Sequence, residues 1–235
     1  MAKKSDIKII ANGHVIEVYR YEKPTISEYK GNGGRTKETS ERAEEHRKNS
    51  SKATRNRVRR QVLANFDERS KFITLTYKDN VTDLEVTNRD FKRFIQRLRY
   101  RYGGFKYLAV IEFQERGAIH YHMISNLPYI ENNKLAELWG RGFVKINDIR
   151  HVDNVGAYMC KYMLKNVQDE RLKGNKAYLS SRGLDKEIVY RGEDARRVLK
   201  ALEIDKKEKV FTNSYESEHN GLIEYEEYNM KRKNE

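Results

Sequence analysis

The sequence of 235 residues contains little cysteine and no long apolar segment, and both absences restrict the class of protein. Its single cysteine, Cys160, excludes an intrachain disulfide and favours a reducing compartment. No apolar run approaches the roughly 20 residues that a membrane-spanning helix needs, so we expect no membrane partner. The first six residues also lack the apolar core of a signal peptide.

Positive charge is what the sequence has in excess. Its 48 Lys and Arg outnumber 35 Asp and Glu, which gives a net charge of +13. The excess lies in residues 1–60 (16 against 8) and 61–200 (26 against 18), whereas residues 201–235 are acidic (6 against 9). Such a balance favours a polyanionic partner, nucleic acid first. The plain alternative is a basic surface that faces only solvent.

The middle of the sequence alternates between strand and helix patterns. Four segments are β-prone, namely 72–77, 107–113, 118–124 and 142–149. Three segments have apolar residues at helical spacing, namely 87–102, 133–139 and a stretch that Asp153 would cap and that runs to about 166. The order β-α-β-β-α-β predicts an α+β fold, a ferredoxin-like or RRM-like split βαβ palm with a central antiparallel sheet, followed by a helix.

Composition divides the chain into three parts. Residues 1–64 form a basic extension, with a hairpin at 7–19 closed by an Asn-Gly turn and a charged, solvated helix over 39–63. Residues 65–200 contain the patterned domain. Residues 201–235 form a polar, acidic tail that we expect to be partly disordered.

A pair of histidines, His120 and His122, lies in the second strand of the expected central hairpin and points to one face. A three-residue loop with Gly117 in the left-handed conformation would place Glu112 opposite His120, whereas a four-residue loop would turn Glu112 away. Two imidazoles and a carboxylate suit a divalent metal, Mn or Mg, and zinc also fits. The alternative is a pair of surface histidines without a ligand.

Two tyrosines, Tyr158 and Tyr162, share a face of the last helix, and Lys161 and Lys165 each follow one of them by three residues. The adjacent apolar stripe, which includes Cys160, is expected to pack on the sheet. A nearby ammonium would stabilise a phenolate, and a metal would withdraw charge from a phosphate. The residues therefore favour metal-assisted cleavage of a phosphodiester by tyrosine. Alternatively, the tyrosines only close the edge of the core beside snorkelling lysines.

These motifs resemble those of the HUH endonuclease superfamily, in particular the two-tyrosine rolling-circle replication initiators of phages and plasmids. Three motifs occur in the order of that family: Phe72-Ile-Thr-Leu-Thr76, His120-Tyr121-His122 and Tyr158-x-x-x-Tyr162. The family usually has an aliphatic residue where this chain has Tyr121, which is still apolar enough to pack inward. Segments 138–144 and 180–184 also look like bacterial and phage members, and the resemblance covers about residues 70–185.

The resemblance implies that residues 65–200 are an HUH endonuclease domain that nicks and joins single-stranded or hairpin origin DNA. The ligands Glu112, His120 and His122 would hold Mn or Mg against the scissile phosphate. One tyrosine would attack phosphorus, giving a 5′-phosphotyrosine and a free 3′-hydroxyl, and the second would act at termination. Their order stays open, and Lys161 and Lys165 are further candidates for stabilising phosphate or phenolate.

The resemblance also implies partners and a place. The sequence lacks a G-x-x-x-x-G-K-[ST] loop, so a separate host helicase would unwind the DNA, and a DNA polymerase would extend the 3′-hydroxyl. The setting would be the cytoplasm of a bacterial host. The basic extension and the arginines of segment 87–102, among them Arg93 and Arg99, would contact phosphates or simply face solvent.

Four other hypotheses compete with replication initiation. A two-tyrosine HUH transposase would carry out the same reaction, although a single cysteine excludes a cysteine-rich finger. A non-enzymatic RRM-like module would need aromatics on its central strands, where this sequence has histidines and a glutamate. A metal hydrolase that uses water would form no covalent adduct. A conjugative relaxase is disfavoured because the tyrosines follow the histidines.

Overall fold

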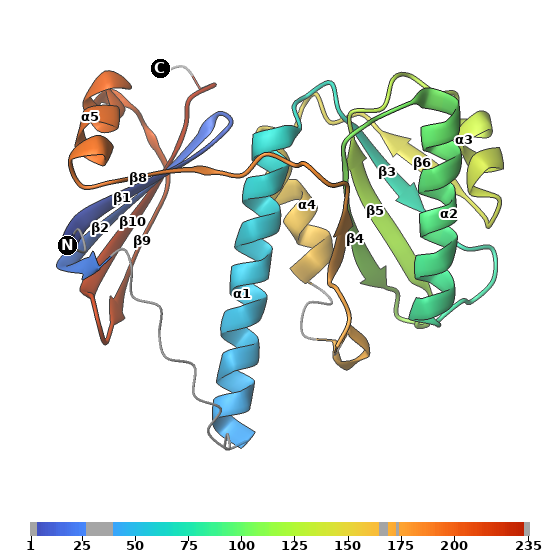
Figure 1. Ribbon diagram of the computed structural model, residues 1–235, viewed down its shortest axis with the longest axis horizontal. Helices are drawn as coiled ribbons and strands as arrows, with labels where there is room; N and C mark the ends of the chain where they lie inside the picture. The colour runs from blue at the N-terminus through green and yellow to red at the C-terminus, as the bar shows by residue number, and fades with distance from the viewer. Residues whose placement is uncertain (1–3, 27–39, 165–168, 173, 233–235) are drawn as a thin grey trace. The chain divides into compact units, whose positions relative to one another are not determined.

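The computed structural model describes residues 4–26, 40–164, 169–172 and 174–232. The chain forms two compact units, one of residues 38–185 and one that combines residues 1–37 with residues 186–235 (Figure 1). Within the described part of the chain, no helix combines the length and apolar character that crossing a bilayer requires.

The unit of residues 38–185 is built on a five-stranded antiparallel sheet with the strand order β6-β3-β5-β4-β7. The strands are β3 (Lys71–Leu75), β4 (Tyr107–Phe113), β5 (Ile119–Ser125), β6 (Val144–Asn147) and β7 (Tyr178–Ser180). The helices are α1 (Ser40–Asn65), α2 (Leu84–Tyr102), α3 (Asn132–Trp139), α4 (Val155–Leu164) and the 3-10 turn η1 (Glu170–Leu172). The order β3-α2-β4-β5-α3-β6 and the pairing β6-β3-β5-β4 confirm the α+β split βαβ palm.

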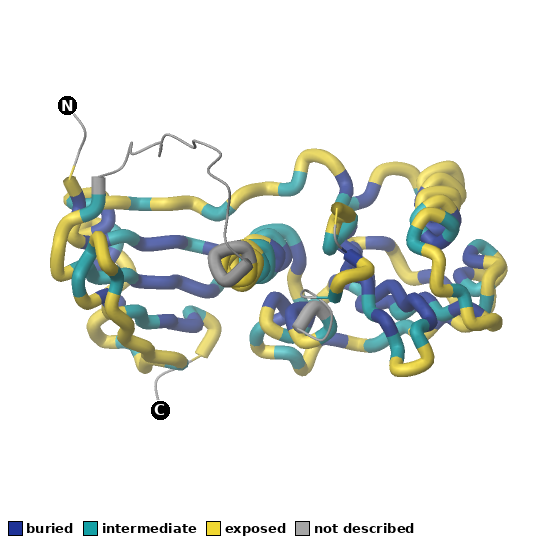
Figure 2. Tube along the Cα trace, turned by 90° about the horizontal axis from the view of Figure 1, so that it is seen from below, coloured by how far each residue is buried: buried dark blue, intermediate teal, exposed yellow. Residues whose placement is uncertain are grey.

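The two faces of this sheet have separate cores, because strand side chains alternate in direction. Helices α2 and α3 pack on one face and α4 on the other (Figure 1), and buried residues follow the strands (Figure 2). The first core contains Ile73, Leu75, Ile111, Tyr121, Phe91, Phe94 and Trp139. The second core joins Phe72, Leu108, Val110 and Ile124 of the sheet to Val58, Val62 and Met159 of α1 and α4.

Two helices begin at residues other than those the sequence predicts. Helix α2 starts three residues before Thr87, because the Asp83 carboxylate accepts hydrogen bonds from the Glu85 and Val86 amides at 2.7 and 3.1 Å. At the start of α4, the Asn154 side chain rather than Asp153 accepts a hydrogen bond from the Ala157 amide, at 2.8 Å. Both neighbours are good caps by type, so local propensity could not choose between them.

The second unit contains a five-stranded antiparallel sheet with the order β8-β1-β2-β10-β9. Its strands are β1 (Lys4–Asn12), β2 (Val15–Ile26), β8 (Ile188–Arg191), β9 (Lys209–Ser217) and β10 (Gly221–Asn229). Helix α5 (Glu193–Ala201) and the turn η2 (Ile204–Lys206) pack on one face around Ile9, Val18 and Leu199. The predicted Asn-Gly hairpin turn is confirmed, with Asn12 paired to Val15 and Gly13 at φ +56°.

The compact units differ from the division of the sequence at residues 64 and 200. Helix α1, expected in a solvated extension, contributes buried Val58 and Val62 to the palm. Residues 201–235, expected to be a partly disordered tail, instead form β9 and β10. Averaging composition over the segment concealed the alternation of β10, in which Ile223 and Tyr228 are buried among exposed and half-buried glutamates.

Candidate active site

The β4-β5 hairpin has the register that the three-residue loop predicts. Glu112 lies opposite His120, and Val110 lies opposite His122. The Gln114 amide donates to the Ala118 carbonyl at 2.9 Å to close the loop, and Gly117 has the left-handed φ of +86°. Glu112 therefore shares a sheet face with both histidines.

His122 is held at both ring nitrogens. Its Nε2 lies 2.5 Å from Oε2 of Glu112, and its Nδ1 lies 3.1 Å from Oγ1 of Thr74, its cross-strand partner in β3. The side chain is buried, with a relative exposure of 5%. Because neighbours from two different strands fix it, the orientation of this imidazole is strongly determined.

His120 points to the same face two residues earlier and is also buried. Burial lowers the pKa of His120, and the neighbouring His122 lowers it further, against the opposing effect of Glu112. The lowered pKa favours the neutral imidazole, which is the form that binds a metal.

The donor set suits a divalent ion by residue type and by face, but the side chains do not form a ligand cluster. Within the described residues, no three His, Cys, Asp or Glu side chains are close enough together to hold a metal. Glu112 and His122 instead hydrogen bond to each other, with His120 beside them on the same strand face.

Helix α4 places both tyrosines on this same face. The ring of Tyr162 stacks on that of His122, with 3.9 Å between ring centroids and 27° between planes. The Tyr162 hydroxyl donates to the Tyr158 hydroxyl at 3.3 Å. Phe72 of β3 packs against both tyrosines, with centroid distances of 5.0 and 5.2 Å. The histidine strand and the tyrosine helix, 36 residues apart between His122 and Tyr158 in the sequence, therefore meet in space.

The environment of Tyr162 favours its neutral form. Burial raises the pKa of Tyr162 well above the usual value, and the hydrogen bond with Tyr158 raises it further. A phenol in this state is a weak nucleophile and needs activation. Lys161 is exposed, with its Nζ 5.8 Å from the centroid of the Tyr158 ring. Lys165 lies outside the described residues.

A glycine brings α4 close to α1. A Cβ atom added at Gly156 would lie 2.6 Å from the Arg59 carbonyl oxygen, so only glycine fits there without a shift. Cys160 on the same side donates its thiol hydrogen to the Arg55 carbonyl, with Sγ 3.5 Å from the oxygen. The apolar stripe of α4 was expected to pack on the sheet alone. Part of it instead contacts α1, because α4 lies between the sheet and that helix.

Two residues of this face, Phe72 and Thr74, were not identified individually from the sequence. Both belong to the segment 72–76 that contributed to the resemblance, and they lie two apart on one strand face. That period-two spacing was the available signal. Their contact with His122 depends on the pairing of β3 with β5, strands separated by 43 residues between Leu75 and Ile119, and no local pattern specifies it.

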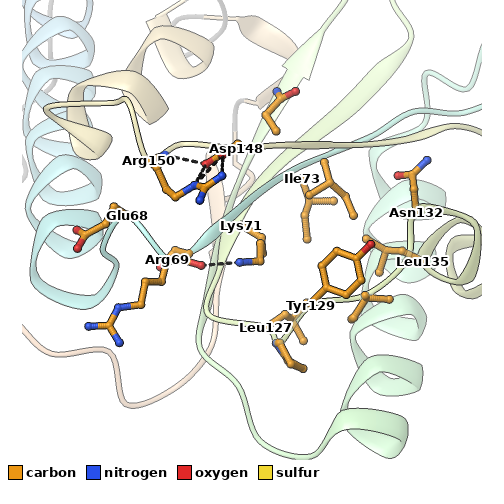
Figure 3. Close-up of a pocket in the computed structure, with 15 residues that line it drawn as sticks. Glu68, Arg69, Lys71, Ile73, Leu127, Tyr129, Asn132, Leu135, Asp148 and Arg150 are labelled. Carbon is orange, nitrogen blue, oxygen red and sulfur yellow. Dashed lines mark hydrogen bonds and ion pairs between the residues drawn. The ribbon is translucent and has the colours of Figure 1, made fainter.

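The chemistry of this face is separate from a cavity of about 530 Å³ elsewhere in the unit (Figure 3). Lys71, Leu127, Tyr129 and Leu135 line this cavity, and Arg150 at its edge forms a two-pronged ion pair with Asp148. Ile73 and Leu135 belong to the core under α2 and α3, so the cavity lies on the face away from the tyrosines. None of its lining residues carries the chemistry described above.

Comparisons with known proteins agree on replication. Residues 70–167, which span β3 to α4, match the family model of replication-associated proteins of the ORF2 type. The "Phasyl DNA replicon protein arp" of Escherichia coli is 29% identical over an alignment of 136 residues, which covers 44% of this chain and 46% of that protein. The chain thus spans about half the length of this curated relative. No solved structure matches the chain significantly.

The matched region contains both histidines and both tyrosines of the site. The two likenesses point to a replication-associated protein, and they favour replication initiation over the other hypotheses considered from the sequence.

Proposed function

We propose that the protein initiates rolling-circle replication by nicking and rejoining single-stranded or hairpin DNA at an origin, in the cytoplasm of a bacterial host. One observation carries the proposal: Tyr162 stacks on His122 at 3.9 Å and hydrogen bonds to Tyr158. Two candidate nucleophiles therefore lie against a face that also carries Glu112 and His120. The likeness to replication-associated proteins supports this assignment.

The proposed reaction is a transesterification. The phenolic oxygen of Tyr158 or Tyr162 forms a bond to phosphorus, and the bond from phosphorus to the 3′-oxygen breaks. The phenol gives up a proton and the departing oxygen gains one, so the step leaves a 5′-phosphotyrosine and a free 3′-hydroxyl. A second 3′-hydroxyl reverses the reaction and joins the strands, which conserves the energy of the phosphodiester.

Glu112, His120 and His122 would hold a divalent ion, Mn or Mg, and when bound it would withdraw charge from the scissile phosphate. Two imidazoles and a carboxylate on one face support this assignment. Because Glu112 and His122 hydrogen bond to each other, ion binding would replace that bond. Lys161 beside Tyr158, and Lys165 further along the sequence, would stabilise the phosphate or a phenolate.

The partners follow from this reaction. Origin DNA is the substrate, a DNA polymerase would extend the 3′-hydroxyl, and a separate host helicase would open the duplex. An RRM-type binding module would need an open sheet face opposite α2 and α3. Helix α4 packs on that face and brings its tyrosines there, which favours chemistry over binding alone.

The test is covalent capture on DNA. Purified protein is mixed with Mn and a labelled pool of single-stranded DNA that carries candidate origins, and the products are separated on a denaturing gel. We expect an adduct with the 5′ end of the cleaved product. It should be lost in Tyr158→Phe/Tyr162→Phe and in His120→Ala, and retained in the matched control Tyr129→Phe, which alters an exposed tyrosine outside the site. Single tyrosine variants would show which one attacks first.

Two outcomes would overturn the proposal. Metal-dependent cleavage without an adduct would indicate a nuclease that uses water, with structural tyrosines. Binding without cleavage on every origin-bearing pool would indicate a nucleic-acid-binding module. A two-tyrosine transposase would form the same adduct, and the likeness to a replicon protein favours the initiator over it.

A further inference from the structure

A large groove lies along the β7 edge of the palm, within the unit of residues 38–185. Its volume is about 1830 Å³, and its walls come from α1, α2 and the segment 169–182. Small-molecule pockets usually measure about 300–1,000 Å³, so this groove suits a polymer better. Seven cationic side chains line it: Arg47, Lys48, Arg57, Lys92, Arg99, Lys176 and Arg182.

The negative charge of the groove is already neutralised. Its three carboxylates each have an ion-pair partner: Glu44 pairs with Lys48 at 2.9 Å, Glu170 with Arg47 at 3.9 Å and Asp169 with Arg171 at 2.5 Å. The other five cations form no ion pair with any part of the chain that the structure describes. These five, which we call the groove cations, are Arg57, Lys92, Arg99, Lys176 and Arg182.

The remaining lining can also recognise phosphates. Hydroxyl and amide side chains lie between the cations, among them Thr54, Asn88, Gln96 and Asn175. Such groups commonly donate hydrogen bonds to phosphate oxygens in nucleic-acid complexes. A row of unpaired cations with interleaved donors therefore fits a polyphosphate backbone better than an acidic peptide or an isolated anion.

The groove adjoins the tyrosine face. Tyr178 of β7 lines the groove and packs in the same core cluster as Tyr158 and Tyr162. We infer that the groove holds the backbone of the single-stranded DNA whose scissile phosphate lies at the tyrosines. This inference rests on the proposed function, because that function supplies the strand. The groove cations then contribute affinity that does not depend on sequence.

Helix α2 offers a matched control for this inference. Lys92 and Arg99 lie seven residues apart on one helix face and line the groove. Arg93 and Arg101 belong to the same helix, are equally exposed and do not line it. From the sequence alone these arginines could not be told apart, whereas the structure assigns different surroundings to them.

The experiment compares Lys92→Gln/Arg99→Gln with Arg93→Gln/Arg101→Gln, both in Tyr158→Phe/Tyr162→Phe protein so that no cleavage occurs. Fluorescence anisotropy measures the binding of a labelled single-stranded oligonucleotide over a range of salt concentrations. We expect the groove variant to bind about tenfold more weakly at physiological salt, with a salt slope reduced by about 1.4 for two lost phosphate contacts. The control, with the same change of charge, should stay within about twofold of the parent.

Several results would overturn the inference. Equal loss in both variants would indicate diffuse attraction to a basic protein, and no loss in either would remove the groove from DNA binding. A loss confined to a duplex probe would identify duplex DNA as the occupant. Thermal melting of each variant separates lost contacts from misfolding, and Lys176→Gln/Arg182→Gln tests the opposite wall independently.

The outcome is distinguishable from failure of the proposed function. If protein with intact tyrosines forms no adduct while the groove variant still loses affinity, the groove stands and the nicking proposal fails. If the adduct forms while both groove variants bind normally, the nicking proposal stands and the groove inference fails.

Discussion

The site converges on the His122 side chain. Glu112 and Thr74 occupy its two ring nitrogens, and the Tyr162 ring covers one of its faces. The sequence predicted the position of Glu112 correctly, because hairpin register follows from loop length. It could not single out Thr74, because that contact joins strands that are neither consecutive nor linked by a turn.

Thr74 is a positioning residue with a testable effect. Thr74→Val keeps the shape of the side chain and removes the hydrogen bond to Nδ1 of His122, so the imidazole should lose its fixed orientation. We expect adduct formation to slow about tenfold, equivalent to about 1.4 kcal/mol for one hydrogen bond. Thr76→Val is the control, because its hydroxyl bonds to the Phe143 carbonyl away from the site. Equal rates in the two variants would remove Thr74 from the mechanism.

Cys160 should be unreactive in the folded protein. Burial raises the pKa of Cys160 to about 11, from a usual value near 9. A rise of that size lowers the thiolate fraction at pH 8 about a hundredfold, so iodoacetamide should label the native protein about a hundredfold more slowly than the urea-unfolded chain.

The same raised pKa fixes the sign of a pH effect on stability. The unfolded chain releases the thiol proton first, so the free energy of unfolding should fall as pH rises from about 9 to about 11. Labelling at equal rates in native and unfolded protein would contradict the burial of Cys160. A Cys160→Ala variant, which has no thiol to titrate, should lack this contribution to the pH dependence.

At the scale of elements, strong local patterns predicted the helices and strands of the palm in the correct order. Errors arose at helix starts and at the partner of α4, since those depend on capping geometry and on packing against α1. The close approach at Gly156 has no sequence signature apart from the glycine itself.

Gly156→Ala tests that helix contact. The new Cβ would lie 2.6 Å from the backbone carbonyl oxygen of Arg59 and 2.8 Å from Cγ of Leu63, so the helices must separate. Overpacking of this kind costs about 1–3 kcal/mol, which urea denaturation would measure as a lower midpoint. Gly104→Ala is the control, since no atom lies within 4 Å of its added Cβ. We expect its effect to stay within about 0.5 kcal/mol. Similar losses in both variants would refute the contact.

At the scale of the whole molecule, the sequence was divided by composition, whereas the fold is divided by strand pairing. Strands β1 and β2 pair with β8 and β10, more than 160 residues later in the chain, so both ends build one unit. Pairing over such separations leaves no local pattern in either segment. The charge of residues 1–60 is likewise shared between two units, because α1 belongs to the palm.

Two truncations separate these divisions. A fragment of residues 38–185 retains α1, so Val58 and Val62 still bury against Met159 and Phe72. We expect it to melt cooperatively and, if nicking needs only this unit, to form the covalent adduct. A fragment of residues 65–200 lacks α1 and exposes that apolar surface along with Cys160, so it should melt at lower temperature or aggregate. Circular dichroism and size-exclusion chromatography compare the two directly. Equal stability would mean that α1 is an extension after all, as composition indicated, and that the core shared by α1 and α4 contributes little to the palm.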